Sequence, residues 1–239
     1  MLTASPSPSP STAGTIAGPP AAVRTGASLV LAGAVAEYGV TTLHPHRAAP
    51  NDHAHAFAEY AASTGWTAVH LGQFLAGGVV LIGVLVLLAG LRSAGAPALV
   101  TRIGAALTVL AGGVLAVLQG VDGVALKHAV DSLAAAPPAL HDVWLHDAQV
   151  VRWIEEAMAA YSRITLGLSL LALGAAVATS RGLPRWTAGA AVVSGVAFLI
   201  DGVVVSTAGF SDQVLASLLA WLALAVFALT SAAAAWHRR

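Results

Sequence analysis

The chain contains 239 residues, of which 57% are hydrophobic and 9% charged, and its eleven basic and eleven acidic side chains cancel. A soluble domain is about 45–50% apolar and about 25% charged, so this composition indicates a protein embedded in a lipid bilayer. The zero net charge gives no support for nucleic acid as a partner. The absence of cysteine excludes disulfides and thiolate ligands, so a metal site would have to use oxygen and nitrogen atoms.

The first 20 residues, MLTASPSPSPSTAGTIAGPP, are rich in Ser, Pro, Ala and Gly. Such a segment is too poor in large apolar residues to fold alone, so we expect residues 1–20 to form a disordered cytoplasmic tail. No basic stretch directly precedes an apolar run here, which is unlike a cleavable signal peptide. The remainder, residues 21–239, is predicted to form one transmembrane domain.

Six segments of this domain are apolar and long enough to cross a bilayer as helices, which takes about 20 residues. They cover residues 25–43, 66–91, 98–121, 160–180, 185–206 and 213–235. The third helix is expected to continue beyond Asp122 until Pro137 and Pro138 stop it, and the fourth to begin outside the membrane, near Asp142 or Asp147. The predicted fold is therefore an all-α polytopic integral membrane protein of about six transmembrane helices.

The positions of lysine and arginine predict the orientation, because short cytoplasmic loops carry an excess of both. With the N-terminus inside, seven of these residues fall on the cytoplasmic side and four on the outer side. We therefore expect a multi-pass protein of the cell membrane with both termini in the cytoplasm and the lipid bilayer as its main partner. All eleven acids and eight of nine histidines then fall in the outer half, where short helices from residues 44–65 and 122–160 are expected to form a cap.

Glu37 and Asp201 are predicted to lie deep in the first and fifth spans, where a carboxylate costs about 2.5 to 3.5 kcal/mol. Such side chains face the bundle interior and need a partner. The two acids could carry coupling protons in a small transporter. A buried hydrogen bond to a neighbouring helix would explain them equally well.

His70 and Gln73 lie three residues apart at the outer end of the second span, so they share one helix face. His70 could bind a metal or relay protons with Glu37. The pair could also serve only to fix helix packing. In the second outer segment, His128 and Asp131 form another candidate ligand pair, for which the alternative is a helical cap held by ion pairs.

The first outer connector, HPHRAAPNDHAHAFAEY at residues 44–60, contains four histidines, an aspartate and a glutamate. If FAEYAAS is helical, His55 and Glu59 lie four residues apart on one face, and together with His53 they could hold zinc or another divalent ion. The spacing matches no recognised zinc motif. The alternatives are a solvated turn leading into an interfacial helix capped at Asn51–Asp52, and a pH-responsive segment.

An acid shortly before Gly-Val recurs in three spans that run outward: EYGV, VDGV and IDGV. Three related helix hairpins would explain this recurrence. Chance would explain it almost as well in a chain so rich in Gly, Val and Ala.

Three functional hypotheses follow, with a purely structural role as the alternative to all of them. The first is a binding or sensing protein whose ligand is a small molecule or an ion. Its ligand or proton site would comprise Glu37, His70, Gln73, Asp122, His128 and Asp201, and its metal ligands would be His53, His55 and Glu59. The second is a small proton-coupled transporter that uses Glu37 and Asp201. The third is a membrane metalloenzyme with a metal-activated water, and the sequence does not decide whether the protein is an enzyme.

The chain resembles a group of bacterial multi-spanning membrane proteins of unknown function. Three segments carry the resemblance: PNDHAHAFAEYAASTGWTAVHLGQF, LQGVDGVALKHAVDSLAAAP and VVRWIEEAMAAYSR. It covers most of the chain after the tail. It implies an integral membrane protein of the cell envelope and brings no activity, substrate or catalytic residue.

Overall fold

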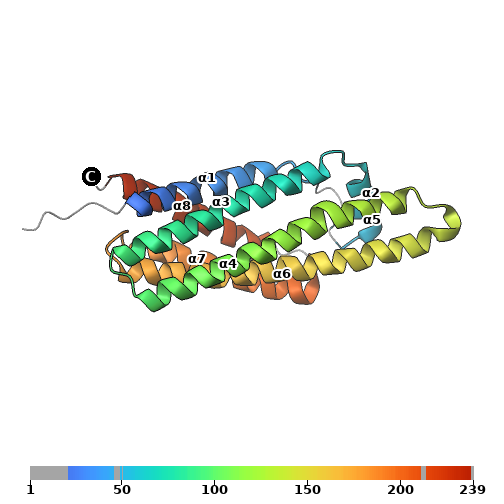
Figure 1. The fold of residues 1–239 in the computed structure, drawn as a ribbon. Coiled ribbons are helices and arrows are strands. Elements are labelled where there is room, and N and C mark those ends of the chain that lie inside the picture. Colours follow the sequence, from blue (N-terminus) through green and yellow to red (C-terminus); the bar gives the residue numbers. More distant parts are fainter. Residues whose placement is uncertain (1–20, 46–48, 50, 211–213, 238–239) are drawn as a thin grey trace, which may run out of the picture.

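The computed structural model describes residues 21–45, 49, 51–210 and 214–237, and its elements are all helical (Figure 1). The α-helices are α1 (Ala21–Thr41), α2 (His53–Ala62), α3 (Trp66–Ser93), α4 (Ala98–Gly120), α5 (Lys127–Ala134), α6 (His141–Thr179), α7 (Trp186–Ala208) and α8 (Val214–His237). A π-helical segment, η1 (Val121–Leu126), joins α4 to α5, and a 3₁₀ turn, η2 (Pro138–Leu140), precedes α6. The tail predicted for residues 1–20 lies outside the described residues.

Within the described ranges, five helical stretches are long and apolar enough to cross a membrane. They are Trp66–Ser93, Ala98–Ala134, Pro138–Thr179, Trp186–Ala208 and Leu215–His237. The prediction of an all-α polytopic membrane fold is confirmed. The span predicted at residues 25–43 is present as α1, a helix of 21 residues that falls outside this set of five.

The sequence predicted where the third helix ends and where the fourth begins, on either side of Pro137 and Pro138. The helical path of α4 continues through η1 and α5 to Ala134, shortly before Pro137, as expected from a residue that lacks the backbone donor. Helix α6 begins at His141, beside Asp142, which is the first of the two predicted starts, and runs for 39 residues. As a result, α4 to α6 form an extended hairpin that projects past the other helices (Figure 1).

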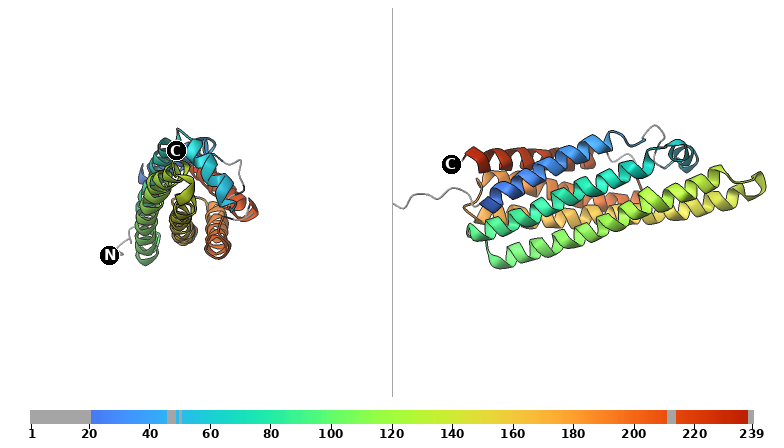
Figure 2. Two further views of the ribbon diagram at one scale, coloured as in Figure 1. Left: turned by 90° about the vertical axis from the view of Figure 1, so that its right-hand side faces the viewer. Right: turned by 45° about the horizontal axis from the view of Figure 1, so that its top comes forward.

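The six long helices pack in a closed ring, in the order α1, α3, α4, α6, α7, α8 and back to α1. They run side by side along the molecule, and α2 lies across one end, where it contacts α5 and α6 (Figure 2). The C-terminal end of α8 lies at the opposite end (Figure 1). We call the two ends the α2 end and the terminal end.

Helices α1 and α3 approach each other closely because glycines face each other along their interface. A Cβ atom added to Gly26 would lie 2.5 Å from the backbone nitrogen of Leu87, and one added to Gly83 would lie 2.6 Å from that of Val30. Small residues at helix contacts are the usual means of close packing in membranes. This contact fixes the end of α1 beside the beginning of α3, which positions the site described next.

Candidate metal centre

His70 lies in the second turn of α3 at the α2 end and is only 1% exposed. Its Nδ1 is 2.8 Å from the carbonyl oxygen of Trp66, one turn earlier. A carbonyl can only accept, so Nδ1 carries the proton and the lone pair of the neutral ring is on Nε2. Metal-binding histidines are typically oriented by this kind of hydrogen bond.

Asp122 approaches His70 from the π-helical segment η1. Its Oδ2 atom lies 2.9 Å from Nε2 of His70. Among the described residues, neither this Nε2 nor Oδ1 of Asp122 has a hydrogen-bond partner, although both atoms are buried. Two atoms with lone pairs therefore face each other, which is costly unless a proton or a metal cation lies between them.

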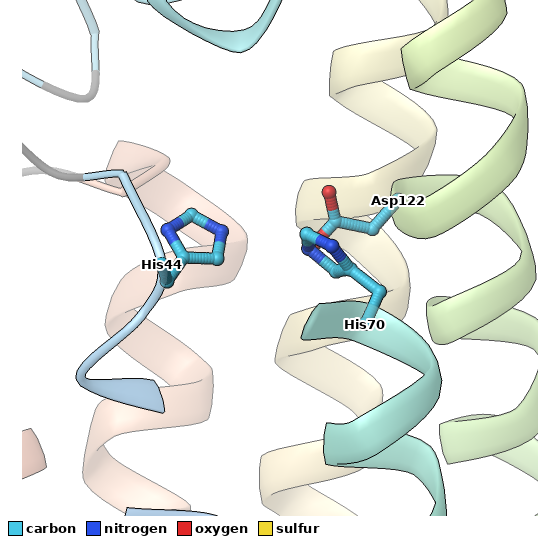
Figure 3. Close-up of side chains that lie close together, drawn as sticks. All are labelled: His44, His70 and Asp122. Atoms are coloured by element: carbon cyan, nitrogen blue, oxygen red, sulfur yellow. The ribbon is translucent and has the colours of Figure 1, made fainter. Parts of the chain in front are cut away.

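His44 completes the group from the segment that follows α1. One ligand atom from each of His44, His70 and Asp122 lies within 4.8 Å of the other two. Figure 3 shows the His44 ring directed across a gap towards the other two side chains. Its Nδ1 is 2.6 Å from the carbonyl oxygen of Pro45, so its proton also belongs on Nδ1. We call these three residues the His44–His70–Asp122 centre.

The π-helix and a glycine bring Asp122 against α3. The indole nitrogen of Trp66 donates to the Asp122 carbonyl at 2.8 Å, and the Thr67 hydroxyl donates to the Gly123 carbonyl at 2.9 Å. A Cβ atom at position 123 would lie 2.6 Å from Cβ of His70, so only glycine permits this approach. π-Helical turns are frequent at functional sites, and here the turn supplies both a ligand and the backbone contacts that hold it.

Aromatic side chains enclose the centre on the side of α2. The Trp66 ring, 1% exposed, has its centroid 4.4 Å from that of His70 and 4.9 Å from that of His44. The Tyr60 ring of α2 packs on Trp66 with a centroid distance of 4.3 Å, and burial raises the pKa of Tyr60 to about 12. Exclusion of water strengthens electrostatic interactions within such a site.

A charged cluster on α6 lies on the other side of Tyr60. Nη1 of Arg152 is 2.7 Å from a carboxylate oxygen of Glu155, and its Nε is 3.9 Å from Glu156. The Arg152 guanidinium also lies over the Tyr60 ring, at 5.6 Å. The Asp122 carboxylate also acts on this guanidinium electrostatically, which links the charged cluster to the centre.

The ionisation of His44 fits metal binding as well. Burial lowers the pKa of His44, while the Asp122 carboxylate opposes the shift and the neighbouring His70 and Arg152 add to it. The ring is therefore neutral over a wider range of pH than an exposed histidine. The neutral form is the one that binds a metal.

The residues predicted for a ligand or proton site occupy several places. His70 and Asp122 meet, as described above. Gln73 lies one turn deeper on α3 and donates to the Thr41 hydroxyl at 3.3 Å. His128 is exposed on α5. Asp201 is buried on α7, away from the centre.

Asp201 lies on α7, where its Oδ2 is 3.0 Å from Nε of Arg163 and its Oδ1 accepts from the Ser217 hydroxyl at 2.8 Å. Glu37 is half-buried on α1, and its Oε2 atom is buried without a hydrogen-bond partner in the described part of the chain.

The predicted metal ligands His53, His55 and Glu59 all lie on α2. His53 stacks on Phe57 with a centroid distance of 5.4 Å, and the 81% exposed His55 side chain pairs with Asp52 at 2.7 Å. Asp52 is also the N-cap of α2, as predicted, and the hydrogen bonds from His55 lower the pKa of its carboxyl. Across the described residues, the one group of three or more His, Asp and Glu side chains placed to share a metal is the His44–His70–Asp122 centre.

The role of His44 was missed by sequence reasoning, although the residue belongs to the histidine-rich connector. The available signal was its position, because a histidine directly after one span lies level with a histidine at the start of the next. Comparison of the sequence and the fold with known proteins found no matching protein family, no matching curated protein and no matching solved structure, so the resemblance described above stays a prediction.

Proposed function

We propose that the protein is an integral membrane protein that binds a divalent transition-metal ion, with zinc as the leading candidate, at the His44–His70–Asp122 centre. The observation that carries this proposal is the buried Nε2 of His70, 2.9 Å from the Asp122 carboxylate and without a hydrogen-bond partner in the described structure. A third ligand atom, from His44, lies within 4.8 Å of both.

The donor set selects the class of metal. Two imidazoles and a carboxylate are typical of zinc, whose ligands at about 2.0–2.2 Å lie roughly 3.3 Å apart in tetrahedral geometry. A small inward movement of His44 would bring it to that distance. Calcium and magnesium prefer shells made entirely of oxygen, so the two imidazoles disfavour both. With three protein ligands, a fourth position remains for water or for a ligand molecule.

The α2 end is proposed to face outward, with both termini in the cytoplasm. The terminal end carries basic residues in its helix ends and short connectors, namely Arg24, Arg92, Arg102, Arg181 and Arg185. The α2 end instead collects carboxylates. Short basic connectors are characteristic of the cytoplasmic face, which supports a metal centre on the outer side of the membrane.

Metal analysis of the purified protein tests this proposal. The full-length chain in detergent, equilibrated with micromolar zinc and then desalted, should retain about one zinc per chain by mass spectrometry. The substitutions His44→Ala and Asp122→Asn should each reduce the zinc content to below about a tenth, because each removes one of three ligands.

The matched control is His55→Ala, which removes an exposed histidine from the adjacent helix and should leave the zinc content unchanged. Nickel, cobalt and copper in parallel samples would define the preferred ion. Zinc-free wild-type protein, or zinc lost from His55→Ala and retained by His44→Ala, would contradict the assignment.

A further inference from the structure

A line of residues, most of them polar, leads from the metal centre into the helix bundle between α1, α3 and α4. Its members recur at a spacing of four and then three residues towards the centre: Glu37 and Thr41 on α1, followed by His44; Gly77, Gln73 and His70 on α3; Leu115 and Gln119 on α4, followed by Asp122 in η1. Residues three and four apart share a helix face. The three helices therefore present matching levels, about 10 Å apart from first to last at 1.5 Å per residue.

Contacts at each level support this register. At the deepest level, a Cβ atom on Gly77 would lie 2.8 Å from Leu115 and 4.0 Å from Oε2 of Glu37. At the middle level, the Gln73 amide donates to Thr41 at 3.3 Å. The last level is the His44–His70–Asp122 centre itself.

Two oxygen atoms on this line lack donors. Oε2 of Glu37 and Oε1 of Gln119 are both buried, and neither has a hydrogen-bond partner among the residues that the structure describes. Gln119 lies one turn nearer the centre than Leu115 on the same face of α4. A buried acceptor without a donor is destabilising, and a bound cation would remove that cost.

Two other carboxylates of the helix bundle, those of Asp201 and Glu155, have arginine partners, whereas Glu37 has none among the described residues. Asp201 pairs with Arg163 and Glu155 with Arg152, whereas no salt bridge in the described structure includes Glu37. An ionisable residue inside a membrane without a basic partner is a candidate for an ion or proton pathway. Asp201 already pairs with Arg163, so it is not available as a ligand for a moving cation.

We propose that the side-chain oxygens of Gln119 and, one turn deeper, Glu37 form successive oxygen-only cation positions, and that the protein moves its metal ion from the His44–His70–Asp122 centre along the α1–α3–α4 interface past these positions and across the membrane. This inference rests on the proposed metal binding. Tight nitrogen ligands capture the ion at the α2 end, and weaker oxygen ligands deeper in the bundle let it leave.

Zinc uptake by proteoliposomes tests the pathway. The full-length chain is reconstituted in vesicles that hold a zinc-sensitive dye, and a potassium gradient with valinomycin sets an inside-negative potential. Wild-type vesicles should take up zinc faster than protein-free vesicles. Glu37→Gln, which keeps the shape and removes the charge, should reduce the rate at least tenfold while retaining about one bound zinc per chain.

The control is Tyr38→Phe, since the Tyr38 side chain is 76% exposed beside Glu37 and should leave both the rate and the zinc content unchanged. Gln119→Leu, a second variant, should also slow uptake, and retained zinc in either variant shows that the fold is intact. Uptake by Glu37→Gln at the rate of Tyr38→Phe would overturn the pathway, and so would wild-type vesicles that bind one zinc per chain without uptake. Wild-type protein that binds no zinc would instead refute the metal centre on which the pathway depends.

Discussion

The segments VDGV, residues 121–124, and IDGV, residues 200–203, place an aspartate in the same local sequence but in different electrostatic surroundings. Asp201 lies against the Arg163 guanidinium and accepts a hydrogen bond from Ser217. Oδ2 of Asp122 lies 2.9 Å from Nε2 of His70, with a proton or a cation needed between them, and Oδ1 has no donor in the described structure. The first carboxylate is neutralised by an arginine within the protein, whereas the second has only an imidazole beside it, which is why we propose it as a metal ligand.

The glycine of each segment has the same function. A Cβ atom on Gly123 would lie 2.6 Å from Cβ of His70, and one on Gly202 would lie 2.8 Å from the Ala160 carbonyl. Both glycines therefore let their helix approach a neighbour closely. The difference between the segments arises from the backbone of η1, which is π-helical, and from the residue that each aspartate meets.

The largest difference between the two aspartates should appear in the stability of the metal-free protein. Asp201→Asn leaves the mostly buried Arg163 without its counter-charge, and breaking a buried pair costs about 3–5 kcal/mol. Asp122→Asn should change stability by less than about 1 kcal/mol, because the new amide can donate to Nε2 of His70. Thermal unfolding in detergent should therefore show a large decrease in Tm for Asp201→Asn alone. Equal decreases would show that Asp122 is also a structural ion-pair partner.

The two glycines should separate metal binding from packing. Gly123→Ala forces η1 away from His70, so zinc affinity should fall at least tenfold, together with about 1–3 kcal/mol of stability. Gly202→Ala should cost similar stability through the α6–α7 contact but leave zinc affinity unchanged. Zinc titration and thermal unfolding of both variants measure the two effects. Equal zinc affinity in the two variants would contradict the role given to Gly123.

The fold could be predicted from the sequence because the bilayer requires long apolar helices. His70 and Asp122 were also detectable, since a polar residue at the end of an apolar helix stands out against its neighbours. The metal ligands His53, His55 and Glu59, inferred from local spacing, stay a prediction. His55 and Glu59 are four residues apart on α2, but the structure pairs the exposed His55 with Asp52.

The complete centre could not be read from the sequence for two physical reasons. Its ligands come from three segments that meet only through the close α1–α3 packing and the α3–η1 contact. Its geometry also depends on the π-helical turn at Val121–Leu126, which changes the direction of Asp122 relative to a regular helix. No sequence pattern reveals the packing at Gly26 and Gly83 or the π-helical turn. The sequence therefore does not show which histidine lies opposite Asp122.

The smallest expected difference concerns pH. Because burial lowers the pKa of His44, the folded state favours the neutral ring. The stabilisation from this residue is therefore fully present above the ordinary histidine pKa of 6.5 and is lost as the pH falls through the lowered pKa of the folded state. The Tm of metal-free wild-type protein should decrease as the pH falls below 6.5. The substitution His44→Asn should remove the part of this decrease that comes from His44, and it should leave the Asp201–Arg163 pair intact. In the presence of zinc the slope should steepen, since protons compete with the metal for the imidazoles. An identical pH profile for His44→Asn and wild type would show that His44 titrates as an exposed histidine and does not lie in the enclosed centre.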